Sequence, residues 1–367
     1  MLARGLQFGI AIALLSDLAG SAFAQSFTRE EIRIPMAAAG PRGLEALVVR
    51  PDQPGRYPLA LISHGSPRDA VERRKMSPFA FMPQAIEFAR RGWAAVIVMR
   101  RGYGGSAGNW VETSGPCNNR DYVASATTSA ADLRAAIAHL TRREDIDATK
   151  IISVGQSAGG FATVALTADP PANLVASISF AGGRGSRADH EVCQEDRLVE
   201  AMRNLGRRSR LPMLWVYAEN DKFFGPALAR RMHNAFVSAG GSAEFVMAPP
   251  FGRDGHMLFS LAGIPDWTPI IDRFLKANRL VLRESLLPPP PLPALDPPAS
   301  LSPSGIKAFD SYRAAPPRKA FAVSPGGAYG WRSGRRTADD AKERALSACR
   351  ERASDCRIFA VDDANLR

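Results

Sequence analysis

The chain has 367 residues, of which 46% are apolar and 23% are charged, and its formal net charge is +11. This length and apolar content allow at least one complete core, and they exclude collagen, low-complexity disorder and a small peptide held together by cysteines. The basic residues occur in scattered pairs such as Arg100 with Arg101 and Arg207 with Arg208, without a long basic run or interleaved aromatic residues. We therefore expect a solvated charged surface and no nucleic-acid partner.

Residues 1–24 have the layout of a bacterial secretory signal peptide. Arg4 supplies a positive start, residues 8–15 form a short apolar stretch, and residues 22–24 read Ala-Phe-Ala, a small-x-small cleavage site. The alternative is an uncleaved anchor or a buried first helix, but the apolar stretch is shorter than the ~18 residues of a membrane span. No later stretch reaches that length, so we expect a periplasmic or secreted protein with no transmembrane segment after cleavage.

Composition divides the rest of the chain into two units joined by a linker. Proline occupies eight of the eighteen positions from 286 to 303. Because prolines hold the backbone extended, this stretch predicts a semi-rigid spacer. We place an α/β domain at residues 25–283, the proline-rich linker at 284–304 and a small C-terminal domain at 305–367.

Short apolar segments alternate with helical patterns through the larger domain. The clearest helical pattern covers about residues 121–142, where Leu133, Ile137 and Leu140 form one apolar stripe. The alternation predicts a mostly parallel sheet with helices on both faces, and functional residues in the loops after the carboxyl ends of the strands. The predicted strands are residues 44–50, 59–63, 94–99, 151–154, 175–180, 213–217 and 243–247.

The G-x-S-x-G motif at residues 155–159 is the strongest chemical signal in the sequence. It follows an apolar β-branched segment and opens an alanine-rich helix, which is the strand, sharp turn and helix of a nucleophile elbow. Gly155 and Gly159 permit a close approach of strand and helix, Gln156 completes the elbow, and the hydroxyl of Ser157 should be exposed above the sheet. This context disfavours a tight turn with an ordinary serine, so we predict that Ser157 is a nucleophile.

A serine hydroxyl is a poor nucleophile without a base, and His256 is the histidine best placed to be that base. It lies in the glycine-rich loop after the last predicted strand, whereas the other four histidines lie in an earlier turn, in helical patterns or in a charged insertion. A capping or surface histidine is the alternative. Asp221 follows the penultimate predicted strand and is our candidate for the carboxylate that orients the base, with Glu219 and Asp254 as competitors. The order Ser, Asp, His is the one that this architecture requires.

An early predicted strand ends in an HGSP turn at residues 64–67. The backbone amides of Ser66 and Ala158 are our candidates for an oxyanion hole, where two donors would receive the negative charge of a tetrahedral intermediate. We expect His64 to brace this turn by hydrogen bonding rather than to transfer protons.

Five motifs occur in a fixed order: HGSP at 64–67, RGYGGS at 101–106, GQSAGG at 155–160, END at 219–221 and DGH at 254–256. Together they resemble the α/β-hydrolase superfamily, in particular its dienelactone-hydrolase-like and prolyl-oligopeptidase-like branches, over about residues 30–280. The resemblance implies an eight-stranded sheet and a serine hydrolase mechanism in which Ser157 attacks, His256 shuttles the proton and Asp221 orients it. Dienelactone hydrolases proper use a cysteine nucleophile where this chain has serine.

Residues 182–210 lie where enzymes of this superfamily place a cap. The segment holds seven arginines, which either attract a substrate carboxylate or form a solvated helix face.

The four cysteines form an even set, which suits an exported protein. Two fall in each domain, so we predict that Cys117 pairs with Cys193 and that Cys349 pairs with Cys356. We expect no metal site, because the chain has no C-x-x-C motif and no histidine at ligand spacing from a cysteine.

The C-terminal domain reads as a small sheet-and-helix unit. We predict strands at 321–323 and 357–361, a glycine-rich turn containing Tyr329 and Trp331, and a helix at about 337–351. The unit resembles a cysteine-containing domain of unknown function found in exported bacterial proteins. Its 13 basic and 8 acidic residues suit contact with anionic envelope polymers, and a stabilising appendage is the alternative.

We expect an exported serine hydrolase that cleaves a small-molecule carboxylic ester through an acyl-enzyme, without a metal or an organic cofactor. One alternative is a peptidase like the prolyl oligopeptidases, although no propeller-sized segment that would screen peptides precedes the hydrolase region. Another is a non-catalytic envelope-binding protein on a hydrolase scaffold, because fold alone does not establish activity. The complete set of triad candidates argues against that scaffold.

Overall fold

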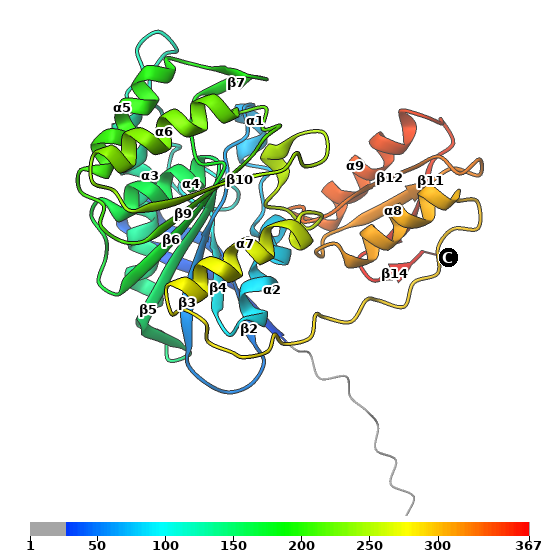
Figure 1. Ribbon diagram of the computed structural model, residues 1–367. Coiled ribbons are helices and arrows are strands. Elements are labelled where there is room, and N and C mark those ends of the chain that lie inside the picture. Colours follow the sequence, from blue (N-terminus) through cyan, green and yellow to red (C-terminus); the bar gives the residue numbers. More distant parts are fainter. Residues whose placement is uncertain (1–26, 367) are drawn as a thin grey trace, which may run out of the picture.

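The computed structural model describes residues 27–366 of the chain (Figure 1). The predicted signal peptide at 1–24 lies outside the described residues. No helix within residues 27–366 combines the length and the apolar character needed to cross a membrane.

A large sheet forms the centre of the molecule. Within the described residues it has eight strands in the order β1-β2-β4-β3-β5-β6-β9-β10. Strand β2 pairs antiparallel with β1 and β4, and all other neighbours pair in parallel, which confirms the expected α/β-hydrolase sheet. The strands are β1 (Phe27–Met36), β2 (Gly40–Pro51), β3 (Tyr57–Ser63), β4 (Ala94–Val98), β5 (Ile146–Gln156), β6 (Leu174–Phe180), β9 (Met213–Ala218) and β10 (Ala243–Ala248).

Strand β1 is the strand of this sheet that the apolar patterns did not predict. Its sequence FTREEIRIPM carries charged residues at four positions, and most of its residues are partly or fully exposed because it lies at the sheet edge. Its register comes from the hairpin partner β2, where Ile32 is opposite Ala46 and Ile34 is opposite Leu44. Pairing with β2, and not an apolar pattern in β1 itself, therefore places β1 at the edge of the sheet.

Helices cover both faces of the sheet, and strand residues alternate between the two resulting cores. In β4, Val96 and Val98 pack into one core, whereas Ala95 and Ile97 pack into the other. The predicted helix at about 121–142 is confirmed as α3. The first core is covered by α3 (Tyr122–Leu140), α4 (Ala158–Thr167), α5 (Glu195–Gly206) and α6 (Pro226–Ser238), and the second by α2 (Met82–Arg90) and α7 (Ile264–Ala277) (Figure 1).

The segment predicted as a cap is joined to the rest of the domain by a disulfide. It folds as β7 (Ser186–Ala188), β8 (Glu191–Val192) and α5. The Cys117–Cys193 disulfide, with Cα atoms 5.1 Å apart, ties it to the loop after β4. The Cys349–Cys356 disulfide, with Cα atoms 6.1 Å apart, lies in the C-terminal domain. Both predicted pairings are confirmed.

The C-terminal domain is a small antiparallel sheet with two helices. Within the described residues its four strands have the order β12-β11-β13-β14. Residues 329–332, which we expected in a turn, form strand β12 opposite β11. Helix α8 was not predicted either, because its start signals, Ser302 as N-cap and Pro303 in the first turn, lie within the proline-rich stretch. The elements are α8 (Pro303–Ala314), β11 (Ala320–Val323), β12 (Tyr329–Arg332), α9 (Ala338–Arg350), β13 (Arg357–Val361) and β14 (Ala364–Asn365).

The C-terminal domain contacts the large domain through ion pairs and one close backbone approach. The linker runs from α7 to this domain along the outside of the large domain (Figure 1), and Leu287 exchanges hydrogen bonds with Arg90 on the way. A Cβ at Gly334 would lie 2.7 Å from Cα of Ala80, so glycine is needed there. The ion pair between Arg344 and Glu72 joins the C-terminal domain to the short helix α1 (Ala70–Arg73). The pairs are Arg318–Glu31 at 2.6 Å, Arg336–Glu45 at 2.7 Å and Arg344–Glu72 at 3.1 Å.

Candidate active site

Ser157 occupies a strained turn between β5 and α4. Its φ and ψ angles are 55° and −121°, a conformation that residues other than glycine rarely adopt. A Cβ at Gly155 would lie 2.2 Å from the carbonyl oxygen of Gly159, and a Cβ at Gly159 would lie 2.1 Å from the carbonyl oxygen of Ser63. Glycine is required at both positions, so the G-x-S-x-G spacing produces the elbow that carries Ser157.

His256 and Asp221 form a buried hydrogen-bonded pair. Nδ1 of His256 lies 3.1 Å from Oδ2 and 3.2 Å from Oδ1 of Asp221. Asp221 is fully buried and also accepts hydrogen bonds from the amides of Phe223 and Phe224, at 2.7 and 2.9 Å. Because a carboxylate only accepts, its position assigns the imidazole proton to Nδ1 and leaves Nε2 able to accept a proton.

The loop that carries His256 is tied to the elbow. Gln156, directly before Ser157, donates a hydrogen bond of 2.8 Å to the carbonyl oxygen of His256. The carboxylate of Asp254 accepts from the amide of His256 at 3.0 Å. The ring of Phe223 stacks on the imidazole with centroids 3.9 Å apart and planes 14° apart. These contacts fix the plane of the imidazole and hold its backbone against the residue that precedes the serine.

Ser157 lines a cavity of about 130 Å³, which we call the serine cavity. Phe223, the residue stacked on His256, lines the same cavity. Among the described residues, no hydrogen bond joins the hydroxyl of Ser157 to His256, whose ring is bonded to Asp221. The structure thus joins two of the three predicted triad residues directly and connects the third through Gln156.

The predicted oxyanion-hole residues, Ser66 and Ala158, also line the serine cavity. The HGSP turn approaches the elbow closely, because a Cβ at Gly65 would lie 3.2 Å from Cβ of Ser157. Neither the amide of Ser66 nor that of Ala158 has a protein acceptor in the part of the chain that the structure describes. Two backbone donors are therefore available beside Ser157.

Tyr103, from the RGYGGS motif, supports the HGSP turn. Its hydroxyl donates to Oε2 of Glu112 at 2.9 Å and lies 2.9 Å from Oγ of Ser66. It also accepts a hydrogen bond of 2.9 Å from the indole of Trp110. The motif therefore positions one of the two candidate oxyanion residues.

A buried charge cluster, formed by Arg100, Glu112 and Arg184, lies next to the HGSP turn. Arg100 and Glu112 are essentially unexposed and form an ion pair, and Glu112 also pairs with Arg184 at 2.6 Å. Arg100 donates further hydrogen bonds of 2.7 Å to the hydroxyl of Ser63 and the carbonyl oxygen of His64. Burial alone would raise the pKa of Glu112, but the guanidinium groups of Arg100 and Arg184 outweigh it and hold the pKa below its usual range. Glu112 is thus a charged acceptor.

His64 is neutral in the folded protein. Burial and the positive charge of Arg100 lower the pKa of its imidazole from 6.5 to about 3. Its Nδ1 donates to the carbonyl oxygen of Gly65 at 2.6 Å, and its Nε2 accepts from the amide of Arg100 at 3.1 Å. These bonds fit the predicted bracing role of His64.

Sequence patterns did not assign the buried charge cluster to the site. Glu112 lies in the irregular loop before α3 and belongs to no motif, and Arg184 was noted only as one of seven cap arginines. One signal was present: Glu112 is the single acidic residue between positions 99 and 120, next to several arginines. An isolated carboxylate in such a stretch is a candidate for a buried ion pair.

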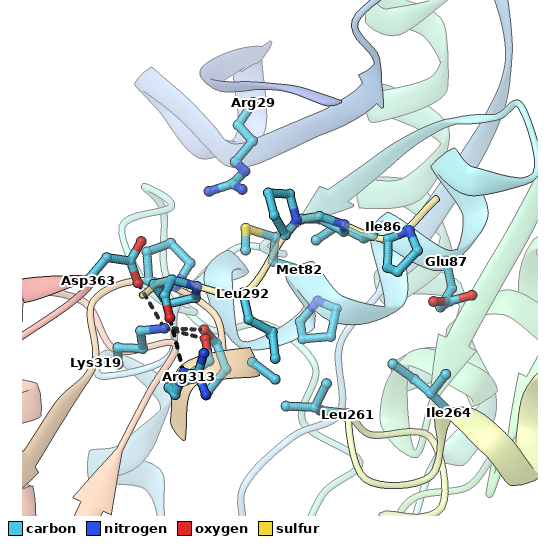
Figure 2. Close-up of a pocket in the computed structure, with 18 residues that line it drawn as sticks. Arg29, Met82, Ile86, Glu87, Leu261, Ile264, Leu292, Arg313, Lys319 and Asp363 are labelled. Atoms are coloured by element: carbon cyan, nitrogen blue, oxygen red, sulfur yellow. Dashed lines mark hydrogen bonds and ion pairs between the residues drawn. The ribbon is translucent and has the colours of Figure 1, made fainter. Parts of the chain in front are cut away.

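A larger cavity of about 200 Å³ lies elsewhere, between α2, the linker and the C-terminal domain (Figure 2). Its walls are mainly apolar and include Met82, Ile86 and Leu292, and Lys319 at one side is held by Asp363 at 3.0 Å. None of the predicted catalytic residues lines this cavity in the described part of the chain. The serine cavity is therefore the candidate active site.

Comparison with known proteins places the chain in a family. A model of the X-Pro dipeptidyl-peptidase (S15) family matches residues 41–232, more than half of the chain. No curated protein matches the sequence.

Several solved structures are similar in fold. A putative dienelactone hydrolase from Klebsiella pneumoniae subsp. pneumoniae is 17% identical, with a TM-score of 0.47, and the match covers 69% of this chain and 98% of that one. The propionate-bound esterase Est2 from Thermogutta terrifontis is 22% identical, with a TM-score of 0.48 and coverage of 70% and 96%. An acylaminoacyl peptidase is 17% identical, with a TM-score of 0.49 and coverage of 69% and 42%.

The matched family region runs from β2 into α6 and contains Ser157 and Asp221. It therefore covers the elbow and most of the eight-stranded sheet described above. The chain belongs to the S15 family, described as X-Pro dipeptidyl-peptidase, and is a serine hydrolase with the α/β-hydrolase fold.

Proposed function

We propose that this protein is an exported serine hydrolase that cleaves a carboxylic ester through an acyl-enzyme, with Ser157, His256 and Asp221 as its triad. The observation that carries the proposal is the link between the strained Ser157 elbow and the buried Asp221–His256 pair, made by the 2.8 Å hydrogen bond from Gln156. An activated serine nucleophile requires a hydroxyl presented on a sharp turn and a nearby base whose tautomer is fixed. Here the serine and the base lie on segments of backbone that are hydrogen-bonded to each other.

In the first step, Nε2 of His256 takes the hydroxyl proton of Ser157 while the oxygen attacks the ester carbonyl carbon. Asp221 accepts from Nδ1 and stabilises the imidazolium that forms. The Ser157–His256 hydrogen bond forms when substrate binds, as is common for catalytic hydrogen bonds that are long in the free enzyme.

The oxyanion of the tetrahedral intermediate is received by the amides of Ser66 and Ala158. Each such donor contributes about 10²- to 10³-fold in rate. The intermediate then collapses, the bond to the alcohol oxygen breaks, and His256 gives its proton to the leaving alcohol. A water molecule deprotonated by His256 attacks the acyl-enzyme in the same way and releases the acid and the free Ser157.

The name of the family raises a second candidate, removal of an X-Pro dipeptide from the amino terminus of a peptide. Such a substrate presents a protonated amine, which needs a carboxylate acceptor near the reacting serine. Glu112 is the carboxylate that lines the serine cavity within residues 27–366, and its oxygens already accept from Arg100, Arg184 and Tyr103. The site therefore favours an ester over a peptide with a free amino terminus.

Export is part of the proposal. The signal-peptide layout of residues 1–24 and the disulfides support it, because disulfides persist in oxidising compartments.

We propose that the C-terminal domain stabilises the large domain. Three of its arginines form ion pairs with acidic residues of the large domain. These ion pairs neutralise part of the positive charge that an anionic envelope polymer would need for binding. The three arginines are Arg318, Arg336 and Arg344.

Reaction with a fluorophosphonate probe tests the proposed function. We expect a covalent label on Ser157, no label in Ser157→Ala, and wild-type labelling in the control Ser238→Ala, which changes an exposed serine at the end of α6. With 4-nitrophenyl acetate, kcat of Ser157→Ala should fall by roughly 10⁶-fold. Folded wild-type protein that neither reacts nor hydrolyses the ester would support the non-catalytic scaffold instead.

A further inference from the structure

The serine cavity is lined by four arginines that come from three segments of the chain. Arg68 and Arg73 lie after the HGSP turn, Arg120 lies before α3, and Arg184 lies at the start of the cap. Glu112 is the acidic residue that lines the same cavity in the described part of the chain. The wall beside the reacting serine therefore carries a large excess of positive charge.

Glu112 does not neutralise this excess. Both of its carboxylate oxygens accept from the buried Arg100, and Oε2 also accepts from Arg184. One negative charge is thus shared between two buried guanidinium groups, which leaves that cluster with a net positive charge. Arg68 is compensated differently, by an ion pair with Asp189 at 3.1 Å and by stacking on Phe223.

Arg73 and Arg120 have no carboxylate partner among the described residues. Arg73 stacks on the ring of Trp110, with its guanidinium carbon 3.6 Å from the ring centroid. Arg120 donates to the hydroxyl of Ser114 and the carbonyl oxygen of Gly115, and these neutral groups do not balance its charge.

Three of the arginines that line the serine cavity also have a buried side-chain donor without a partner among the described residues. The Nε atoms of Arg73, Arg120 and Arg184 are buried and have no acceptor within residues 27–366. Buried donors are normally satisfied in a folded protein, because leaving one unpaired is costly. Arg184 is itself more than nine-tenths buried, so its donor is held in place by the protein. Arg73, Arg120 and Arg184 all line the same cavity, and guanidinium groups gathered around one cavity are the complement of a carboxylate.

We propose that the serine cavity contains a carboxylate subsite formed by Arg73, Arg120 and Arg184, and that the natural substrate is a short-chain ester that also carries a free carboxylate. This inference rests on the proposed function. The cavity of about 130 Å³ is smaller than the roughly 300 to 1,000 Å³ of pockets for drug-sized ligands, so the part of the substrate that it holds is small. Its carboxylate pairs with the guanidinium groups while the ester carbonyl reaches Ser157.

A pair of synthetic esters that differ in one charge tests the subsite. The probes are 4-nitrophenyl hydrogen adipate, which carries a free carboxylate, and its neutral methyl ester. We expect the wild-type protein to hydrolyse the carboxylate ester with a kcat/KM at least about tenfold higher, mainly through a lower KM, because charge-assisted hydrogen bonds are the stronger ones. Added salt should reduce this preference.

Matched variants assign the preference to individual residues. Arg73→Gln and Arg120→Gln should each lower the ratio of kcat/KM for the carboxylate ester to that for the methyl ester towards one, whereas Arg73→Lys should retain part of the preference. Arg208→Gln, which removes an exposed cap arginine outside the serine cavity, is the control and should behave as wild type. Succinate should inhibit hydrolysis of the methyl ester competitively in the wild type and less strongly in Arg73→Gln.

The outcomes separate this inference from the proposed function. Labelling of Ser157 and hydrolysis of the methyl ester without any preference for the carboxylate ester would overturn the subsite and leave the serine hydrolase intact. No labelling and no hydrolysis of either ester would overturn the proposed function itself. The comparison of the two esters on wild-type protein decides the question even where a variant fails to fold.

Discussion

Two acidic residues near the end of β9 differ sharply in their surroundings. Asp221 is buried and bonded to His256, whereas Glu219 is exposed. A single side chain can therefore be tested for the orienting role with its near neighbour as the control.

Asp221→Asn should lower kcat for 4-nitrophenyl acetate by about 10³- to 10⁴-fold, because an amide in place of the carboxylate no longer holds the imidazole proton on Nδ1. Glu219→Gln should keep wild-type kcat. Steady-state kinetics on the two purified variants measure the difference. A large loss in Glu219→Gln with little loss in Asp221→Asn would reassign the orienting carboxylate.

The buried His64 makes the free energy of unfolding depend on pH. Its pKa is about 3 in the folded protein against 6.5 for the free side chain, so the unfolded chain binds more protons between these values. The contribution of neutral His64 to the free energy of unfolding is therefore fully present above pH 6.5, and it is lost as the pH is lowered towards about 3. The lowered pKa of Glu112 acts in the same direction below its usual value of 4.5.

Urea titrations between about pH 7 and pH 5 should therefore show a decreasing free energy of unfolding in the wild type. His64→Gln should weaken that decrease, because it removes the titrating imidazole. An equal pH dependence in both proteins would mean that other groups cause it.

At the scale of elements, the disulfides close loops of very different length. Cys117 and Cys193 are 76 positions apart, and Cys349 and Cys356 are 7 positions apart. In the chain-entropy model the longer loop stabilises by about 4.5 kcal/mol and the shorter by about 2.4 kcal/mol.

Replacing the first pair by serines should therefore lower the free energy of unfolding more than replacing the second pair. Denaturant unfolding of the two double variants measures this order. The first replacement should also raise KM for the carboxylate ester, since Arg120 contacts Cys193 and lines the serine cavity. A larger destabilisation from the second pair would contradict the loop-length argument.

Much of the sheet could be predicted from the sequence because buried parallel strands are continuous apolar runs between breakers. Edge strand β1 and strand β12 could not, because the first is rich in charge and the second follows a glycine-rich turn. The candidates Ser157, Asp221 and His256 could be predicted because each lies in a loop after a strand of one parallel sheet. The buried charge cluster could not, because its contacts join loops as far as 72 positions apart, and no local pattern encodes such a contact.

At the scale of the whole molecule, the C-terminal domain reaches the site through α1. Arg344 on α9 pairs with Glu72, and the next residue of α1 is Arg73 in the serine cavity. This contact leads us to expect that the small domain braces one wall of the site.

Arg344→Ala should raise KM for the carboxylate ester by up to about fivefold, the range of one partly exposed ion pair, and should leave kcat for its methyl ester unchanged. Arg350→Ala, which removes an exposed arginine from the same helix, is the control. Kinetics of both esters with both variants check this. A KM that does not differ between the two variants would confine the domain to a stabilising role.

The sharing of Glu112 between Arg100 and Arg184 also has an evolutionary consequence. Loss of Glu112 alone would leave the guanidinium of the fully buried Arg100 without a counter-ion in the interior, which is strongly destabilising, whereas loss of one arginine still leaves Glu112 paired with the other. Homologues should therefore keep Glu112 wherever both arginines are kept. In an alignment of such sequences, the loss of position 112 should be accompanied by the loss of positions 100 and 184, although the three lie in separate segments.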